Sequence, residues 1–218
     1  MKKFVIGDVH GNYKELKDLL NKINPDFKKD QLIFLGDYID RGPQSYKVIR
    51  LLIDLQENHG KDHLVLLRGN HEDMAIDNIE HDRIDSFNGY DKTFVDFRKN
   101  KDSIENYYEF FKALPLYYED QSFIYVHGGI RPGLAMERQY EEDLLWIREE
   151  FYESSLTFIK PVIFGHTPTV YINGTYSPFI EKDRIGIDTG LAYGGRLTAL
   201  EIQDGKIVKI HNVAKLAA

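Results

Sequence analysis

The residues at 36–42 combine the side chains that phosphate and metal chemistry requires. Asp37, Asp40 and Arg41 supply two carboxylates and one guanidinium, and a glycine stands at each end of the stretch. Carboxylates hold hard cations, and the planar guanidinium of arginine can bind two phosphate oxygens at once. A polar turn with a surface ion pair has the same composition. Taken alone, this stretch leaves a phosphate-and-metal site and a plain turn both open.

Two further stretches repeat the pattern at a regular spacing. Residues 7–11 read Gly-Asp-Val-His-Gly, and residues 68–72 read Arg-Gly-Asn-His-Glu. The sequence places Asp37 29 residues after Asp8 and Asn70 33 residues after Asp37. One strand–helix–strand unit takes about 30 residues. The spacing therefore predicts three consecutive units of strand, motif and helix.

Apolar runs precede all three motifs. The runs at 4–6, 32–35 and 64–67 predict buried strands. Apolar residues at helical spacing predict helices at 12–23 and 48–55. Strands joined by such crossovers run parallel, so the motifs are expected at the carboxyl edge of one sheet, where open α/β sheets bind ligands. Residues far apart in the sequence should therefore meet in one crevice.

The second half of the sequence also alternates apolar runs with short polar segments. Strands are predicted at 123–126, 162–164, 184–187, 197–202 and 207–210. Asp204 and Gly205, between the last two runs, predict a tight β-hairpin turn. We expect this half to form a second, mainly antiparallel sheet that packs against the first.

Four of the eight histidines closely follow predicted strands and stand beside a glycine or an asparagine: His10, His71, His127 and His166. The others lie in polar or unremarkable contexts and are expected to be ordinary surface or core residues: His59, His63, His81 and His211. With two aspartates and an asparagine placed in the same way, the first four predict a two-metal site. Nitrogen and oxygen ligands without sulfur suit Mn, Fe, Zn or Mg-like ions and do not choose among them.

Composition sets bounds on the class of protein. The sequence has 218 residues and a net charge of −7, which predicts one domain spanning 1–218 and gives no basic footprint for general nucleic-acid binding. It has no cysteine, which excludes disulfides, thiolate metal sites and a cysteine nucleophile. No apolar run approaches the roughly 20 residues that span a bilayer, and the first residues do not read as a signal peptide. We expect a cytoplasmic monomer that does not bind membranes.

The three motifs, in this order and at this spacing, resemble those of the phosphoprotein phosphatase branch of the calcineurin-like metallophosphoesterases. His127 with Gly128 and the Gly-His-Thr-Pro segment at 165–168 fit the same family. Residues 145–149 are similar to the arginine segment of the bacteriophage lambda phosphatase. The resemblance covers nearly the whole chain apart from about residues 78–114. It implies an α/β fold, α+β by some schemes, in which two sheets form a β-sandwich flanked by helices.

The resemblance also implies a role for each site residue. Asp8 and His10 would hold a first metal ion, Asp37 would bridge both ions, and the second would be completed by Asn70, His127 and His166. His71 and Asp40 would form an acid pair. Arg41 and Arg148 would clamp the phosphate, which Asn70 and His71 would also contact.

The chemistry implied is a direct attack on phosphorus. A hydroxide that bridges the two metal ions would attack in line, without a phosphoenzyme, and His71 would protonate the leaving oxygen. Mn²⁺ is the expected metal, with Fe, Zn, Ni or Co as alternatives. The positive charge of two ions and two arginines would attract a phosphate dianion despite the acidic protein.

Three functions are compatible with this resemblance. The first, which we favour, is a serine/threonine-type protein phosphatase that hydrolyses phosphomonoesters, including phosphotyrosine as a further target. The second is hydrolysis of dinucleoside polyphosphates, such as diadenosine tetraphosphate, or of RNA caps. Glu72 favours the first, because the symmetric diadenosine tetraphosphate hydrolases usually carry Asp there, whereas Gly194 and Gly195 after residues 188–190 favour the second. The third is a non-catalytic phosphate-binding scaffold, which intact Asp40 and His71 disfavour.

Three features have an alternative interpretation. Arg148 is flanked by acidic residues and, without the resemblance, is expected to be a helix-surface arginine. Trp146 is expected in the core and not as a base-stacking platform. In residues 78–114, aromatic residues alternate with charges, which predicts a helical insertion. It would either have its own small core or form a cap that contacts the substrate, and we favour the cap.

Overall fold

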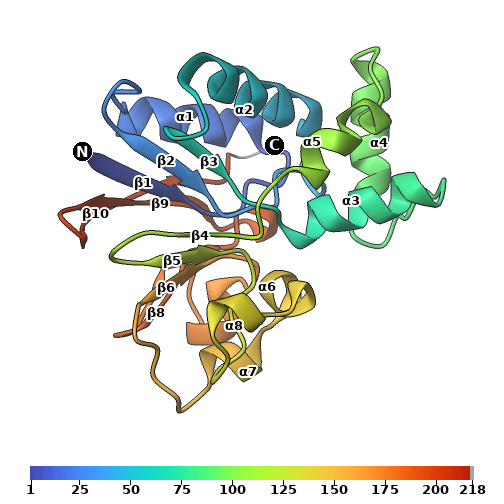
Figure 1. The fold of residues 1–218 in the computed structure, drawn as a ribbon. Coiled ribbons are helices and arrows are strands. Elements are labelled where there is room, and N and C mark those ends of the chain that lie inside the picture. Colours follow the sequence, from blue (N-terminus) through green and yellow to red (C-terminus); the bar gives the residue numbers. More distant parts are fainter. Residues whose placement is uncertain (217–218) are drawn as a thin grey trace.

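The first of two sheets carries the amino-terminal motifs in the computed structural model, which describes residues 1–216 (Figure 1). Its strands, in order across the sheet, are β10 (Lys206–Ala214), β9 (Arg196–Gln203), β1 (Lys2–Ile6), β2 (Gln31–Phe34) and β3 (Leu64–Leu66). The pairs β1–β2 and β2–β3 are parallel, as the spacing predicts. They are parallel because α1 (Tyr13–Ile23) and α2 (Ser45–His59) make the crossovers. The three motifs therefore leave this sheet at one edge.

The second sheet contains β4 (Tyr117–Glu119), β5 (Ile124–Val126), β6 (Val162–Phe164), β8 (Arg184–Gly186) and β7 (Phe179–Ile180), in that order. The prediction that this sheet is mainly antiparallel is wrong, since β5, β6 and β8 are parallel and only the edge strands β4 and β7 are antiparallel. The chain crosses over through η2 (Met136–Arg138), α6 (Glu141–Trp146), α7 (Glu149–Tyr152) and α8 (Thr169–Asn173). His127 and His166 consequently also leave their sheet at one edge.

The predicted hairpin forms, but it joins the first sheet. Asp204 and Gly205 connect β9 to β10 with φ of 51° and 70°, as a type I′ turn requires. β9 pairs with β1 in antiparallel register, with Ala199 opposite Ile6. The strand that leads to Asp8 is therefore hydrogen-bonded on both sides.

The two sheets pack face to face (Figure 1). An apolar cluster with residues from both sheets is buried between them. Val5, Ile33, Tyr125, Ile163 and Leu200 belong to this cluster. Full burial of such a side chain stabilises the fold by about 1.5–3 kcal/mol. The packing confirms the predicted two-sheet sandwich with flanking helices, and it holds both motif-bearing edges in place. Among the helices of residues 1–216, none has the length and apolar character that a bilayer span requires.

Residues 78–114 contain helices at one side of the sandwich (Figure 1). The helices of this region are α3 (Asn70–Glu80), α4 (Tyr90–Lys99), η1 (Ile104–Tyr107) and α5 (Tyr108–Lys112). Phe97, Tyr107 and Phe111 are buried in the same apolar cluster as the helix-covered face of the first sheet. The segment therefore extends an existing core and has no separate one. Its most exposed aromatic residue is Phe87, at 87%.

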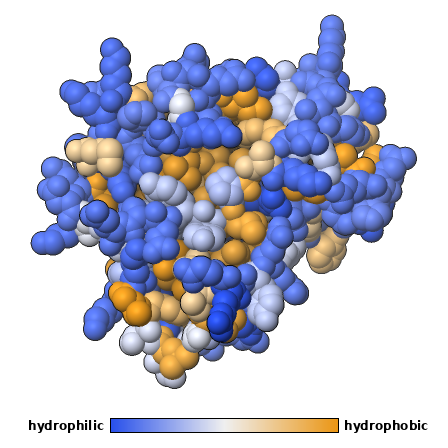
Figure 2. Space-filling model, in the orientation of Figure 1, coloured by the Kyte–Doolittle hydropathy of each residue, from blue (hydrophilic) through white to orange (hydrophobic). Residues whose placement is uncertain are grey.

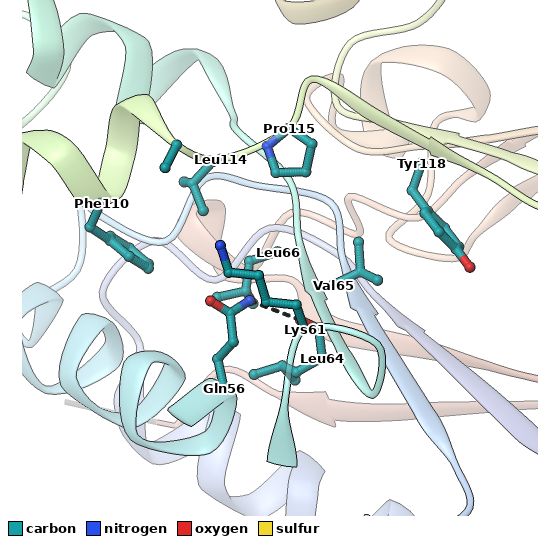
Figure 3. Close-up of a pocket in the computed structure, with 10 residues that line it drawn as sticks. Gln56, Lys61, Leu64, Val65, Leu66, Phe110, Leu114, Pro115 and Tyr118 are labelled. Carbon is teal, nitrogen blue, oxygen red and sulfur yellow. Dashed lines mark hydrogen bonds between the residues drawn. The ribbon is translucent and has the colours of Figure 1, made fainter. Parts of the chain in front are cut away.

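An apolar pocket of about 210 Å³ lies beside the edge strand β3 (Figure 3). Figure 2 shows apolar residues reaching the surface in the middle of the molecule in the orientation of Figure 1. Gln56 Nε2 donates to the Leu64 carbonyl at 2.9 Å, so a side chain occupies part of the open edge of β3. The described residues that line the pocket include no motif residue, so this pocket is not where the motif chemistry takes place.

Candidate metal centre

The structure brings the motifs of both sheets together around Asp37. Asp37 Oδ2 lies 3.4 Å from His10 Nε2, and Asp37 Oδ1 lies 3.3 Å from His127 Nε2. Asn70 Oδ1 lies 2.8 Å from His127 Nε2 and 2.9 Å from His166 Nδ1. Residues from five segments of the sequence therefore share one small volume, as the strand order requires.

Two groups in this volume have ligand atoms that lie within 4.8 Å of one another: His10, Asp37 and His71 in one, and Asp37, His127 and His166 in the other. Asp37 belongs to both groups. This is the arrangement expected of a carboxylate that serves two neighbouring ions. The presence of His71 differs from the predicted ligand set, in which Asp8 stands instead.

Asp8 lies against the same cluster. Its Oδ2 accepts a hydrogen bond from the His166 amide at 3.0 Å, while its Oδ1 is buried without a hydrogen-bond partner among the described residues. His166 Nε2 is buried and unpartnered in the same way. A Cβ at Gly165 would come within 2.2 Å of Asp8 Oδ1. Glycine at this position therefore leaves room for the Asp8 carboxylate, whereas a larger residue would clash with it. Buried polar atoms without partners are costly, and a bound cation would satisfy both.

The carboxylates of the centre crowd negative charge in the interior. Burial raises the pKa of Asp8 well above its ordinary value, and Asp188 and Asp37 raise it further. Burial likewise raises the pKa of Asp37, with Glu72 as the next cause. Divalent cations would offset this repulsion and stabilise the ionised carboxylates.

The histidines of the centre are held in the neutral form. Burial lowers the pKa of His127 to about 3, and it lowers the pKa of His10 and His166 well below the ordinary value. Neutral imidazole is the form that binds metal ions. Neutral histidines, buried carboxylates and an amide oxygen together fit divalent metal ions with nitrogen and oxygen ligands.

Left-handed backbone is concentrated at this centre. Five of the nine described non-glycine residues with positive φ are candidate site residues: His10, Asp37, Asp40, Arg41 and His166. Each such residue costs about 1–2 kcal/mol relative to ordinary helical geometry. Backbone strain of this kind collects at functional sites, where the surrounding fold imposes it.

His71 is tied to Asp40 on its other ring nitrogen. Nδ1 lies 2.6 Å from Asp40 Oδ2, while Nε2 is on the cluster side, 3.9 Å from Asp37 Oδ2. Burial raises the pKa of Asp40 to about 7 and lowers that of His71 to about 3, because both charged forms lose hydration. One proton shared between Nδ1 and Oδ2 satisfies both groups. The geometry suits a histidine whose Nε2 exchanges protons with a ligand.

Thr93, which no motif in the sequence indicates, supports this pair. Thr93 Oγ1 donates to Asp40 Oδ1 at 2.7 Å and accepts from the Asp40 amide at 2.9 Å. Thr93 lies in α4, so the helical segment at 78–114 reaches the site. No motif surrounds Thr93, and only the packing of α4 against α2 brings it to Asp40.

Glu72 ties the second motif to the third. Its carboxylate accepts hydrogen bonds from the amides of Asp37 and Tyr38, both at 2.8 Å, and of Gly69 at 3.0 Å. The side chain is fully buried. Glu72 therefore fixes the loop that carries Asp37 and does not face a ligand.

Replacing Glu72 with alanine should destabilise the protein strongly. Three buried amides would lose their acceptor, at about 1–3 kcal/mol each, so we expect the free energy of unfolding to fall by several kcal/mol. Denaturant unfolding of Glu72→Ala beside Glu57→Ala, an exposed glutamate of α2, measures this. Equal stability of the two variants would contradict the role of Glu72 in the loop.

The two arginines contact different residues of the cluster. Arg41 Nη2 is 3.4 Å from His71 Nε2, and Arg41 Nη1 donates to the Tyr193 hydroxyl. Arg148 Nη1 donates to Thr167 Oγ1 at 3.1 Å. Within residues 1–216, the contacts of both guanidinium groups are to neutral groups and include no carboxylate ion pair. Arg148 is half-buried at the start of α7 and turns to Thr167, so the alternative of a helix-surface arginine is not what the structure shows.

Two further residues lie at the centre: Trp146, for which the sequence prediction is wrong, and Asp188, to which the sequence analysis assigned no role. Trp146 is not a core residue: its side chain is 37% exposed, and its ring meets the ring of His166 edge to face at 5.8 Å. Asp188 is buried, and burial raises its pKa to about 6 although Arg41 and Arg148 act against this. The sequence signal for Asp188 was available, because it follows a strand as Asp8 and Asp37 do.

This geometry agrees with the family assignment. A family model described as calcineurin-like phosphoesterase matches residues 1–201. The chain belongs to the calcineurin-like phosphoesterase family, and it is a hydrolase of the metallophosphoesterase type, whose members use divalent metals.

The chain is also similar to individual proteins and solved structures. The asymmetrical bis(5′-nucleosyl)-tetraphosphatase PrpE of Oceanobacillus iheyensis is 27% identical over 240 residues, covering 96% of this chain and 92% of the relative. A crystal structure of a candidate diadenosine tetraphosphatase superposes with a TM-score of 0.74 at 21% identity, covering 100% of this chain and 95% of that one. A Saccharomyces cerevisiae protein serine/threonine phosphatase with similarity to human PP5 gives a TM-score of 0.69 at 20% identity, covering 100% and 80%. At these identities the two structures show the shared fold, which agrees with the phosphoprotein phosphatase branch.

Proposed function

We propose that this chain hydrolyses dinucleoside polyphosphates, such as diadenosine tetraphosphate, at a phosphoanhydride bond. The observation that supports this most is the similarity to PrpE along 96% of the chain. The sequence favoured phosphomonoesters through Glu72. Because the Glu72 carboxylate is buried and accepts backbone amides, the difference between Glu and Asp there does not bear on the substrate.

We assign one metal ion to Asp8, His10 and Asp37, and a second to Asp37, Asn70, His127 and His166. Support comes from the two groups that share Asp37 and from the unpartnered Asp8 Oδ1 and His166 Nε2. When bound, divalent ions supply positive charge to phosphoryl oxygens and lower the pKa of water to near neutrality. Mn²⁺ is the proposed metal, and the donor set also admits Fe, Zn, Ni or Co.

The other polar residues act on the phosphate and the leaving group. Among the described residues, Arg41 and Arg148 have no carboxylate partner, so their guanidinium groups are available for phosphoryl oxygens, where they stabilise the charge of the transition state. His71 gives a proton from Nε2 to the leaving oxygen, and Asp40 holds the ring in position through Nδ1.

Replacing Arg41 or Arg148 with alanine should reduce kcat/KM by about 10²-fold or more, as the loss of a preorganised donor does. Metal content should stay at the wild-type level, because neither residue is an assigned ligand. Lysine should restore little activity at either position, since it lacks the planar fork. Steady-state kinetics with metal analysis measures this. If both alanine variants keep nearly wild-type rates, the clamp assignment is wrong.

The proposed function is tested by comparing kcat/KM for diadenosine tetraphosphate and for a phosphoserine peptide with Mn²⁺ present. We expect the dinucleotide to be the better substrate. A clear preference for the peptide would overturn the proposal.

Phosphomonoester hydrolysis, with phosphorylated proteins or peptides as partners, is the second candidate. The buried pair of His71 and Asp40, at 2.6 Å, favours it. A serine alkoxide is a poor leaving group that needs a proton, whereas a nucleotide phosphate leaves readily without one.

A further inference from the structure

Three tyrosines form an exposed group beside the candidate centre. Tyr171 lies in α8, Tyr176 follows that helix, and Tyr193 lies in η3 (Leu191–Tyr193). Their side chains are 68%, 36% and 43% exposed, respectively. We call these three residues the tyrosine cluster. Buried tyrosines are common core residues, but three exposed rings close together are available to a ligand.

The segment that precedes β9 holds the cluster in place. A Cβ at Gly190 or at Gly195 would lie 2.5 or 2.6 Å from the ring of Tyr176, so the ring of Tyr176 rests on these glycines. The Tyr176 hydroxyl donates to the Tyr193 carbonyl at 3.2 Å. Tyr171 and Tyr193 meet edge to face, with ring centroids 6.3 Å apart. Gly190 and Gly195 therefore leave room for the ring of Tyr176, and Gly195 is one of the two glycines that the sequence singled out.

The cluster adjoins the proposed phosphate clamp. The Arg41 guanidinium carbon lies 5.0 Å from the centroid of the Tyr193 ring, and Arg41 also donates to the Tyr193 hydroxyl. The same guanidinium reaches to 3.4 Å from His71 Nε2. One arginine thus bridges the ring of Tyr193 and the residue proposed as the acid. A phosphate held by Arg41 would carry its nearest substituent onto the cluster.

We infer that the tyrosine cluster is a nucleoside subsite, on which the base next to the phosphate held by Arg41 stacks. This inference rests on the proposed function, and it assigns residues that select a nucleotide over a simple phosphate ester. Stacking on aromatic rings suits a base because every base has a π-face, and the interaction tolerates different bases. The hydroxyl groups add donors at the rim without adding negative charge near the phosphate.

The test compares two ligands that differ only in the base. Calorimetry on the Mn²⁺-loaded protein gives the Kd of AMP and of ribose 5-phosphate. The ratio of the two Kd values measures how much the base contributes to binding. We expect AMP to bind about tenfold more tightly to the wild type, in line with stacking on one aromatic platform. The ratio should fall toward one in Tyr171→Ala and in Tyr193→Ala.

Two further variants separate stacking from other effects. Tyr193→Phe keeps the ring and loses the hydroxyl that meets Arg41, so it should keep the wild-type ratio. Tyr140→Ala removes a tyrosine of similar exposure, 64%, that lies outside the cluster, and it should also keep the ratio. A loss of the ratio in Tyr193→Phe would mean that the hydroxyl positions Arg41, and it would overturn the subsite.

The outcomes for the subsite and for the proposed function are distinct. Equal affinity of the wild type for both ligands, or an unchanged ratio in both alanine variants, overturns the subsite even if diadenosine tetraphosphate is hydrolysed. A base-dependent ratio that is lost in these variants supports the subsite. Failure to hydrolyse diadenosine tetraphosphate, in turn, removes the proposed function alone.

Discussion

Asp37→Asn is expected to abolish hydrolysis and to lower metal content at both groups of ligands together. The two Asp37 carboxylate oxygens lie 3.4 Å from His10 Nε2 and 3.3 Å from His127 Nε2, so this is the one described side chain that belongs to both groups. Bound divalent ions contribute several kcal/mol of charge stabilisation to hydrolysis, which corresponds to about 10³-fold or more in rate. Activity with metal analysis on the purified variant measures both effects.

The matched control is Asp54→Asn, which removes an exposed carboxylate that pairs with Arg50 on α2. It should keep full activity and metal content. If Asp37→Asn lost one ion and kept the other at wild-type affinity, Asp37 would not be shared between the two ions. A second comparison, Asp8→Asn, should lower the content of one ion first, because the ligands assigned to the second ion do not include Asp8.

His71→Asn is expected to separate substrates by their leaving groups. A positioned general acid contributes about 10²–10⁴-fold, and a serine alkoxide needs its full help, whereas an aryl oxide or a nucleotide phosphate does not. The loss of kcat should therefore be largest on a phosphoserine peptide and much smaller on an aryl phosphate and on diadenosine tetraphosphate. Asp40→Asn should give the same pattern more weakly, because Asp40 reaches the leaving group only through His71.

Metal content has to be measured in the same samples, since His71 adjoins the assigned ligand Asn70 and lies 3.9 Å from Asp37. His81→Asn, at an exposed position, serves as the control. An equal loss on all three substrates, with metals retained and chemistry rate-limiting, would show that His71 is not the leaving-group acid. His71 would then be a metal ligand or a phosphate contact, as its place in the first group of ligand atoms allows.

The spacing of Asp8, Asp37 and Asn70 was sufficient to predict the parallel part of the first sheet. The helices between these residues are long and strongly periodic, so the sequence predicts the crossovers. The crossovers of the second sheet cannot be predicted in this way, because α7 and α8 have four and five residues, too few for a clear helical period. For that reason the sequence predicts the strands β5, β6 and β8 themselves but not their parallel order.

The contacts around the candidate site could be predicted only in part. Residue types and the resemblance predict that the proposed ligands lie together. Thr93, however, contacts Asp40 from a separate helix, and no local sequence pattern predicts this contact. Trp146 looked like a core residue because its neighbours are apolar, and the turn at Arg148 instead places it against His166. The positive φ of Asp37 and Asp40 arises from the surrounding packing. Rules based on neighbouring residues in the sequence do not predict it.

The place of β1 between β2 and β9 also determines the order in which the protein can fold. Ile6 pairs with Phe34 on one side and with Ala199 on the other, and the second contact closes a loop that contains most of the chain. Such long-range pairings slow folding, because chain entropy is lost before the contact forms. During synthesis at about 5–20 residues per second, β1 would wait roughly 10–40 s for its second neighbour, with one edge open. We expect β1 and β9 to gain amide protection in one late step of refolding, and pulse-labelling hydrogen exchange would show whether they do.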